Sequence, residues 1–115
     1  MSQQIIQVNF RYRGSKEEYE KTVAKVAGIC GNMPGLQWKI WLMNEERKEA
    51  GGIYLFSDKA AADKFKRSGM YKYISTSPEY INFNAKQFGL LDVPGMFTAA
   101  PTNMHLAGRY ASVVN

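Results

Sequence analysis

The side chains best suited to chemistry in this sequence are aromatic rings that carry a polar group. Trp38 and Tyr54 lie in apolar stretches, as do Phe10 and Phe56, and these four side chains could line a pocket between a sheet and its helices. The ring faces would bury a small apolar ligand, while the indole N–H and the phenol O–H would orient it. The same side chains could equally be ordinary core packing. The sequence therefore leaves two interpretations of these positions open.

The common catalytic signatures are absent from the sequence. His105 is the only histidine and Cys30 the only cysteine, so the several nitrogen and sulfur ligands of a typical zinc site are lacking. Gly51 and Gly52 lack the spacing of a dinucleotide fingerprint and are more typical of a bulge or a close backbone approach. We expect His105 to be exposed and Cys30 to be a small buried apolar residue. The sequence predicts no metal, haem or flavin.

The net charge of +5 raises the question of a nucleic-acid partner, but the basic residues are dispersed among acidic ones. The densest basic group, Lys64, Lys66 and Arg67, is more typical of a solvated face than of an anion site. Residues 1–4 lack the pattern of a signal peptide, and no apolar run approaches the ~20 residues of a membrane span. We expect a cytoplasmic protein without nucleic-acid or membrane partners.

Three β-strands are predicted from the spacing of apolar residues. Strict alternation predicts a strand over 6–12. Alternation over Leu36 to Met43 predicts a second strand that directs Leu36, Trp38, Ile40 and Leu42 to one side and Gln37, Lys39, Trp41 and Met43 to the other. The stretch from Ala50 to Ser57 is almost continuously apolar, which favours a central strand buried on both faces.

Helices and a last strand complete the pattern. Ser15 and Glu18 form a capping box, which predicts a helix start before an apolar stripe of Tyr19, Val23, Val26, Ala27 and Cys30. Asp58 is a good N-cap for a second helix, which Gly69 interrupts. A fourth strand is expected within 82–91. We divide the chain into a domain over 1–93 and an extended arm over 94–115.

The order β-α-β-β-α-β favours a ferredoxin-like α+β sandwich, in which an antiparallel sheet has both helices on one face. The other face would then be uncovered. Its side chains are too apolar for open water and too polar for the core of a monomer. A second copy of the sheet would cover them, so we expect a homodimer with a contact face that includes Asn9, Arg11, Lys39, Trp41 and Met43.

The stretch from Met33 to Phe65 closely resembles the YdhR-like monooxygenase family. The most specific segments are "PGLQWKIW", which begins at Pro34, and "EAGGIYLFSD", which begins at Glu49, and a charged turn of matching length joins them. Weaker resemblance extends the match to residues 5–93. The resemblance implies a dimeric α+β barrel. It also implies oxygenation of a small hydroxyaromatic or similar apolar substrate without a metal or flavin.

Two other functions share parts of this pattern. The RNA-recognition fold has the same order of elements, but Gly51 and Ile53 stand where its stacking aromatic residues should be, so RNA binding is disfavoured. A non-enzymatic dimer that binds a small apolar ligand would need the same pocket as an oxygenase. The sequence does not discriminate between the enzyme and the ligand carrier.

Overall fold

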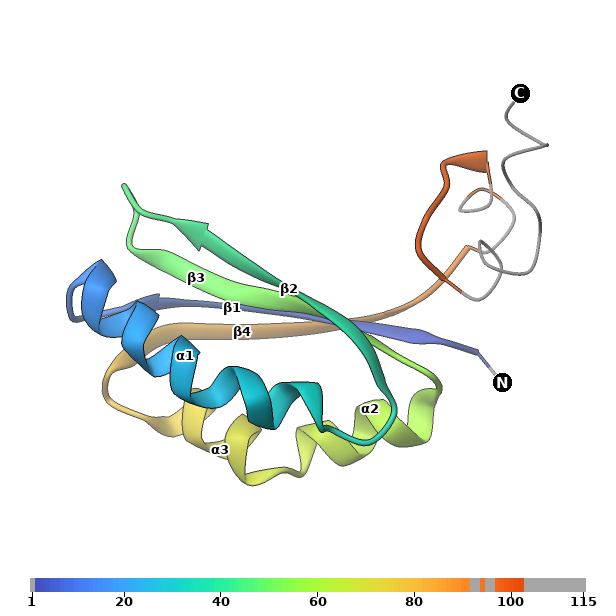
Figure 1. Ribbon diagram of the computed structural model, residues 1–115, viewed down its shortest axis with the longest axis horizontal. Helices are drawn as coiled ribbons and strands as arrows, with labels where there is room; N and C mark the ends of the chain where they lie inside the picture. Colours follow the sequence, from blue (N-terminus) through green and yellow to red (C-terminus); the bar gives the residue numbers. More distant parts are fainter. Residues whose placement is uncertain (1, 92–93, 95–96, 103–115) are drawn as a thin grey trace.

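In the computed structural model, which describes residues 2–91, 94 and 97–102, three helices cover one face of a four-stranded antiparallel sheet (Figure 1). The sheet order is β2-β3-β1-β4, which confirms the predicted ferredoxin-like α+β fold and the central place of β3. In chain order the elements are β1 (Gln4–Tyr12), α1 (Lys16–Gly31), β2 (Leu36–Asn44), β3 (Glu49–Phe56), α2 (Lys59–Lys66), α3 (Gly69–Thr76) and β4 (Tyr80–Gly89).

Polar side chains begin the helices where the sequence predicts. Ser15 Oγ accepts a hydrogen bond from the Glu18 N–H, and the Glu18 carboxylate accepts one from the Ser15 N–H, which is the predicted capping box. Asp58 caps α2 by accepting from the Ala61 N–H. The predicted interruption near Gly69 divides the second helical region into α2 and α3, because Ser68 starts a new helix as its N-cap.

The core lies between the sheet and α2 and α3. Phe65 of α2 is fully buried, with its ring centroid 5.4 Å from that of Phe56 and 4.6 Å from that of Tyr54. Phe10 belongs to the same cluster. The helix α1 packs less deeply, since Cys30 is its only buried residue. This shallow packing leaves a space between α1 and the sheet.

An irregularity at the start of β2 changes the predicted orientation of its side chains. Leu36 pairs with Phe56, whereas Trp38 pairs with Leu55, so Gln37 is an extra residue in this ladder. Such a bulge is tolerated at a sheet edge, and β2 is an edge strand. Because side chains alternate along a strand, one extra residue reverses the facing of every residue that follows it.

The alternation predicted for β2 is therefore wrong beyond the bulge. Lys39 and Trp41 pair with Tyr54 and Gly52 and share the helix side, and the Tyr12 hydroxyl donates to Met43 Sδ on that same side. The residues of β2 that alternate with these lie on the helix-free face, which is the reverse of the prediction. They are Trp38, Ile40 and Leu42.

Two contacts hold the bulged end of β2. The side chain of Gln3 donates a hydrogen bond to Gln37 Oε1. The indole N–H of Trp38 donates to the carbonyl oxygen of Pro101, at 2.7 Å. Pro101 follows β4, and Figure 1 shows the described part of this C-terminal segment on the opposite side of the sheet from the helices.

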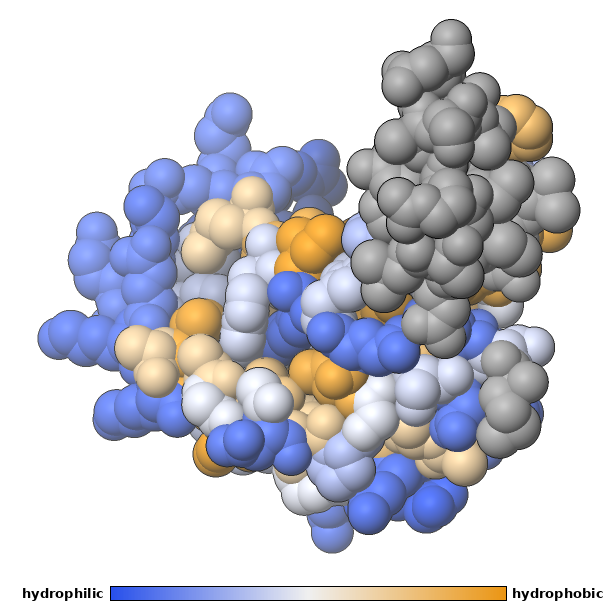
Figure 2. Space-filling view, turned by 45° about the vertical axis from the view of Figure 1, so that its right-hand side comes forward, coloured by the Kyte–Doolittle hydropathy of each residue, from blue (hydrophilic) through white to orange (hydrophobic). Residues whose placement is uncertain are grey.

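The helix-free face carries exposed apolar side chains. Ile40 is 49% exposed and Phe88 50%. Asn9 and Arg11 of β1 lie on this face, as predicted, because they alternate with the buried Val8 and Phe10. Figure 2, an oblique view from the end of the sheet near the C-terminal segment, shows apolar side chains at the surface between hydrophilic ones.

Gly51 provides a test of this sheet packing. A Cβ atom at position 51 would overlap the carbonyl oxygen of Val8 on β1, which bears out the expected close backbone approach. Replacing Gly51 with Ala should lower the free energy of unfolding by about 1 to 3 kcal/mol, because two paired strands would have to separate. Urea denaturation measures the change.

The matched control is Gly28→Ala in α1, where nothing lies within 4 Å of the added Cβ. This variant should be stabilised by about 1 kcal/mol, since alanine has the higher helix propensity. Equal effects of the two substitutions would contradict the close approach.

Candidate functional site

A cavity of about 50 Å³ lies where α1 packs shallowly on the sheet. Residues of all four strands form its floor, and α1 and α3 form its walls. Among the described residues that line it, Lys39 is the only charged side chain. Its other principal residues are Phe10, Tyr19, Trp41, Tyr54 and Tyr80.

Lys39 reaches this cavity because the bulge turns it toward the helices. Its Nζ atom lies 3.3 Å from the centroid of the Trp41 ring and 4.4 Å from that of the Tyr54 ring, which are cation–π distances. Nζ also lies 3.7 Å from Cys30 Sγ. None of the ion pairs found in the described part of the chain involves Lys39. The cation is therefore held by aromatic rings and a sulfur atom.

Burial shifts the protonation equilibria of the cavity. It lowers the pKa of Lys39 to about 8, an effect that the neighbouring Cys30 partly offsets. Burial also raises the pKa of Tyr19 to about 12 and raises the pKa of Tyr54 above its ordinary value. Both phenols therefore keep their protons at neutral pH and can donate hydrogen bonds. The site can enclose an aromatic ring and donate hydrogen bonds to the polar groups of that ring.

Trp41 separates the cavity from two hollows on the surface. One, of about 190 Å³, is bordered by Tyr19, Trp41 and Met43. The other, of about 210 Å³, lies near the end of α1 and is bordered by Cys30, Lys39 and Trp41. The Trp41 side chain is the wall common to all three spaces, and it is 37% exposed.

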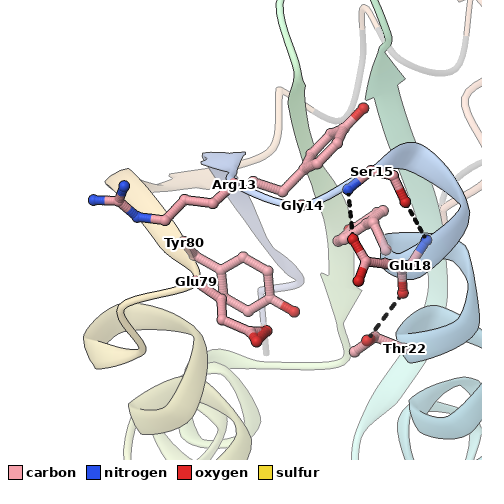
Figure 3. Close-up of a pocket in the computed structure, with 9 residues that line it drawn as sticks. Arg13, Gly14, Ser15, Glu18, Thr22, Glu79 and Tyr80 are labelled. Atoms are coloured by element: carbon pink, nitrogen blue, oxygen red, sulfur yellow. Dashed lines mark hydrogen bonds between the residues drawn. The ribbon is translucent and has the colours of Figure 1, made fainter.

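A larger hollow, of about 280 Å³, lies where β1 leads into α1, but its polar groups already serve the fold (Figure 3). Ser15 and Glu18 bond each other in the capping box, and the Glu18 carbonyl accepts from Thr22. The Arg13 side chain points away from them and donates to the carbonyl oxygen of Pro78. We therefore place the candidate site at the aromatic cavity.

The structure places the four predicted pocket residues in different surroundings. Phe10 and Tyr54 line the cavity, whereas Phe56 is packed in the core behind it. Trp38 does not line it, since the bulge puts this side chain on the opposite face. Whether Phe10 and Tyr54 contact a substrate remains a prediction. His105 lies outside the described residues.

Sequence reasoning missed Lys39 and Trp41 as cavity residues and assigned them, with Met43, to the face that the helices leave open. The missing signal was the bulge, because alternation alone fits either facing of the second half of β2. Within the described residues, no group of three or more His, Cys, Asp or Glu could hold a metal ion. No described helix is long and apolar enough to cross a membrane.

The lowered pKa of Lys39 predicts a pH dependence of stability. The unfolded chain binds this proton more tightly than the folded protein, because the pKa falls from 10.5 to about 8 on folding. The free energy of unfolding should therefore rise as the pH increases from about 8 to 10.5, and this contribution should be constant below that range. Lys39→Met removes this titrating group and the cost of burying its charge. The free energy of unfolding of the variant should therefore exceed that of the wild type at about pH 7, and the difference should be smaller at about pH 10.

Urea denaturation of both proteins at the two pH values measures this difference. Lys25→Met, at an exposed position of α1 that does not line the cavity, is the control for the loss of a lysine charge. A difference between wild type and Lys39→Met that is the same at both pH values would contradict the burial of the cation.

Solved structures of similar fold include proteins of several kinds. NE2512 from Nitrosomonas europaea, of unknown function, has 14% sequence identity and a TM-score of 0.66, and the match covers 79% of this chain and 91% of that one. SnoaB, a cofactor-independent oxygenase from Streptomyces nogalater, has 15% identity and a TM-score of 0.64, with 79% and 95% covered. The heme-degrader MhuD from Mycobacterium tuberculosis has 15% identity and a TM-score of 0.58, with 76% and 95% covered. At these identities the likeness shows the fold alone.

Sequence comparison is more specific. A comparison with curated proteins finds no match. The sequence profile of the family described as "Putative mono-oxygenase ydhR", however, matches residues 5–101. Because this match spans most of the 115 residues, the chain belongs to the ydhR family.

Proposed function

We propose that this protein is a cofactor-independent monooxygenase that acts on a small hydroxyaromatic substrate in the cavity between the sheet and α1. The observation that carries the proposal is the cavity itself, in which Lys39 lies against the rings of Trp41 and Tyr54. Membership of the ydhR family and the similar fold of SnoaB support the general kind of activity.

The reaction needs little from the protein. One atom of O₂ forms a bond to a ring carbon of the substrate, the other atom leaves as water, and the hydroxyaromatic substrate supplies all the electrons and becomes a quinone. The protein has to exclude water, orient the ring and stabilise the charge that develops on its oxygen. Trp41 and Tyr54 supply ring faces, and the tyrosine hydroxyls supply donors.

The similar fold of a heme-degrader makes heme the other ligand to consider. A cavity of about 50 Å³ would have to enlarge far more to hold a macrocycle than to hold a single ring. A small aromatic substrate is therefore the better fit. The alternative is a carrier that binds the same ligand without turnover, and oxygen uptake distinguishes the enzyme from the carrier.

Oxygen consumption tests the proposed activity. Protein freed of metal and flavin should consume O₂ in the presence of at least one member of a panel of phenols, naphthols and hydroxyquinones. Trp41→Phe should lower kcat/KM by about tenfold or more, because the ring at the mouth of the cavity changes shape. Binding of the panel without oxygen uptake would contradict the enzyme and favour the carrier.

Trp38→Phe is the matched control, since it changes the same residue type on the opposite face of the same strand and Trp38 borders the outer hollow near the end of α1 without lining the inner cavity. It should leave kcat/KM within about twofold of the wild type. A larger loss for Trp38→Phe than for Trp41→Phe would contradict the location of the site.

We also propose that two copies of the chain associate through their helix-free sheet faces. The support is the exposed apolar surface of Ile40 and Phe88, which lies on the same face as Asn9 and Arg11. The bulge places Lys39, Trp41 and Met43 on the helix side, so the proposed interface does not include them, which corrects the prediction. Ile40 and Leu42 lie on the helix-free face and belong to the proposed interface instead.

Analytical ultracentrifugation of Ile40→Glu tests this interface. A carboxylate buried between two sheets without a partner is costly, so the dissociation constant of the dimer should rise by about a hundredfold or more. Ile29→Glu is the matched control, because Ile29 is 62% exposed on α1, away from the proposed interface. A wild type that sediments as a monomer at micromolar concentration would refute the dimer.

A further inference from the structure

We infer that the cavity selects ligands with an acidic hydroxyl group and binds them as oxyanions on Lys39, so that its substrate class is acidic phenols and enols rather than neutral arenes. The inference rests on the proposed function for the location of the site. It goes beyond that function by assigning to Lys39 the choice of ligand and of its ionisation state.

Among the described residues, none is seen to offer an oxygen acceptor to the Lys39 ammonium group. An ammonium group has three N–H donors. The contacts of Nζ are the faces of Trp41 and Tyr54 and the sulfur of Cys30, which is a weak acceptor. In the part of the chain that the structure describes, no carboxylate pairs with Lys39. A half-buried cation in this state gains more from an anionic ligand than a solvated lysine would.

The elements that contribute side chains to the cavity around the ammonium group are β1, β2, β3, β4, α1 and α3. No carboxylate is among the described residues that line the cavity. The groups with titratable protons there are Cys30 and Tyr19 from α1, Tyr54 from β3, Tyr73 from α3 and Tyr80 from β4. Burial raises the pKa of Tyr19, Tyr54 and Tyr80, so these phenols do not supply a negative charge at neutral pH. An oxyanion would meet one cation and several neutral donors.

Lys39 lies between the inner cavity and the surface of the molecule. This side chain borders both the inner cavity and the surface hollow of about 210 Å³ beside the end of α1, and Trp41 stands between the two spaces. A ligand ring that enters from the hollow and displaces the Trp41 ring would bring its oxygen to Nζ. The Tyr54 face would remain beneath the ligand, and the indole could stack against its edge.

The arrangement also predicts how binding depends on pH. The complex contains ammonium and oxyanion, so it forms from protonated Lys39 and ionised ligand. The pKa of Lys39 is about 8, and the ammonium form is lost above that pH. Below the ligand's own pKa, the ligand must give up a proton to bind. Affinity should therefore be greatest between these two pKa values and should fall on both sides.

Titration with 4-nitrophenol tests the inference, because its phenolate is yellow and its phenol is not. At about pH 6, where free 4-nitrophenol is mostly neutral, the wild-type protein should increase the phenolate absorbance, with the apparent pKa of the bound ligand lowered by about one unit or more. Lys39→Met should abolish this shift, and Lys39→Arg should retain most of it. Lys25→Met, at an exposed position of α1 outside the cavity, should behave as the wild type.

Thermal denaturation confirms that each variant is folded, and the Met variant removes a buried charge, so loss of folding does not explain loss of the shift. A phenolate signal that persists in Lys39→Met, binding of the neutral phenol by the wild type, or no binding up to millimolar ligand would each overturn the inference. Oxygen uptake is measured separately. A nitrophenolate signal without turnover of any phenol would refute the oxygenase and leave the role of Lys39 intact.

Discussion

One extra residue in an edge strand determines the chemistry of this site. Gln37 has no counterpart in the ladder between β2 and β3, and every later side chain of β2 faces the side opposite to the one that strict alternation predicts. This bulge places Lys39 and Trp41 in the cavity. Without it, Ile40 and Leu42 would face α1 and the cation would lie on the outer face of the sheet. The contact between Gln3 and Gln37 is therefore part of the support of the site, although neither residue lines it.

The fold could be predicted because its signals are local. The Ser15 and Glu18 pair marks the start of α1, and alternation in β1 correctly separates Val8 and Phe10 from Asn9 and Arg11. The same reasoning failed in β2, where both sides of the strand are rich in large apolar residues. A bulge costs little at a sheet edge and leaves no composition signal, so a single sequence does not reveal it.

The site illustrates a conflict between stability and function. A hydrocarbon side chain in place of Lys39 would pack against Trp41 and Tyr54 without the desolvation of a charge. Local choices that disagree with the rest of a well-packed fold are commonly found at functional positions. The shallow packing of α1, in which only Cys30 is buried, is a second such choice. Both features lie at the cavity between the sheet and α1.

The two tryptophans of the chain also make β2 a strand with two optical reporters. Trp41 lies against an ammonium group on the helix side, and Trp38 bonds to Pro101 on the other side. Indole emission responds to nearby charge and to solvent, so the two rings should report on different events in one spectrum. A variant that keeps only one tryptophan would isolate one of these signals. Emission from Trp41 would report occupation of the cavity, and emission from Trp38 would report changes at the C-terminal segment and the helix-free face of the sheet.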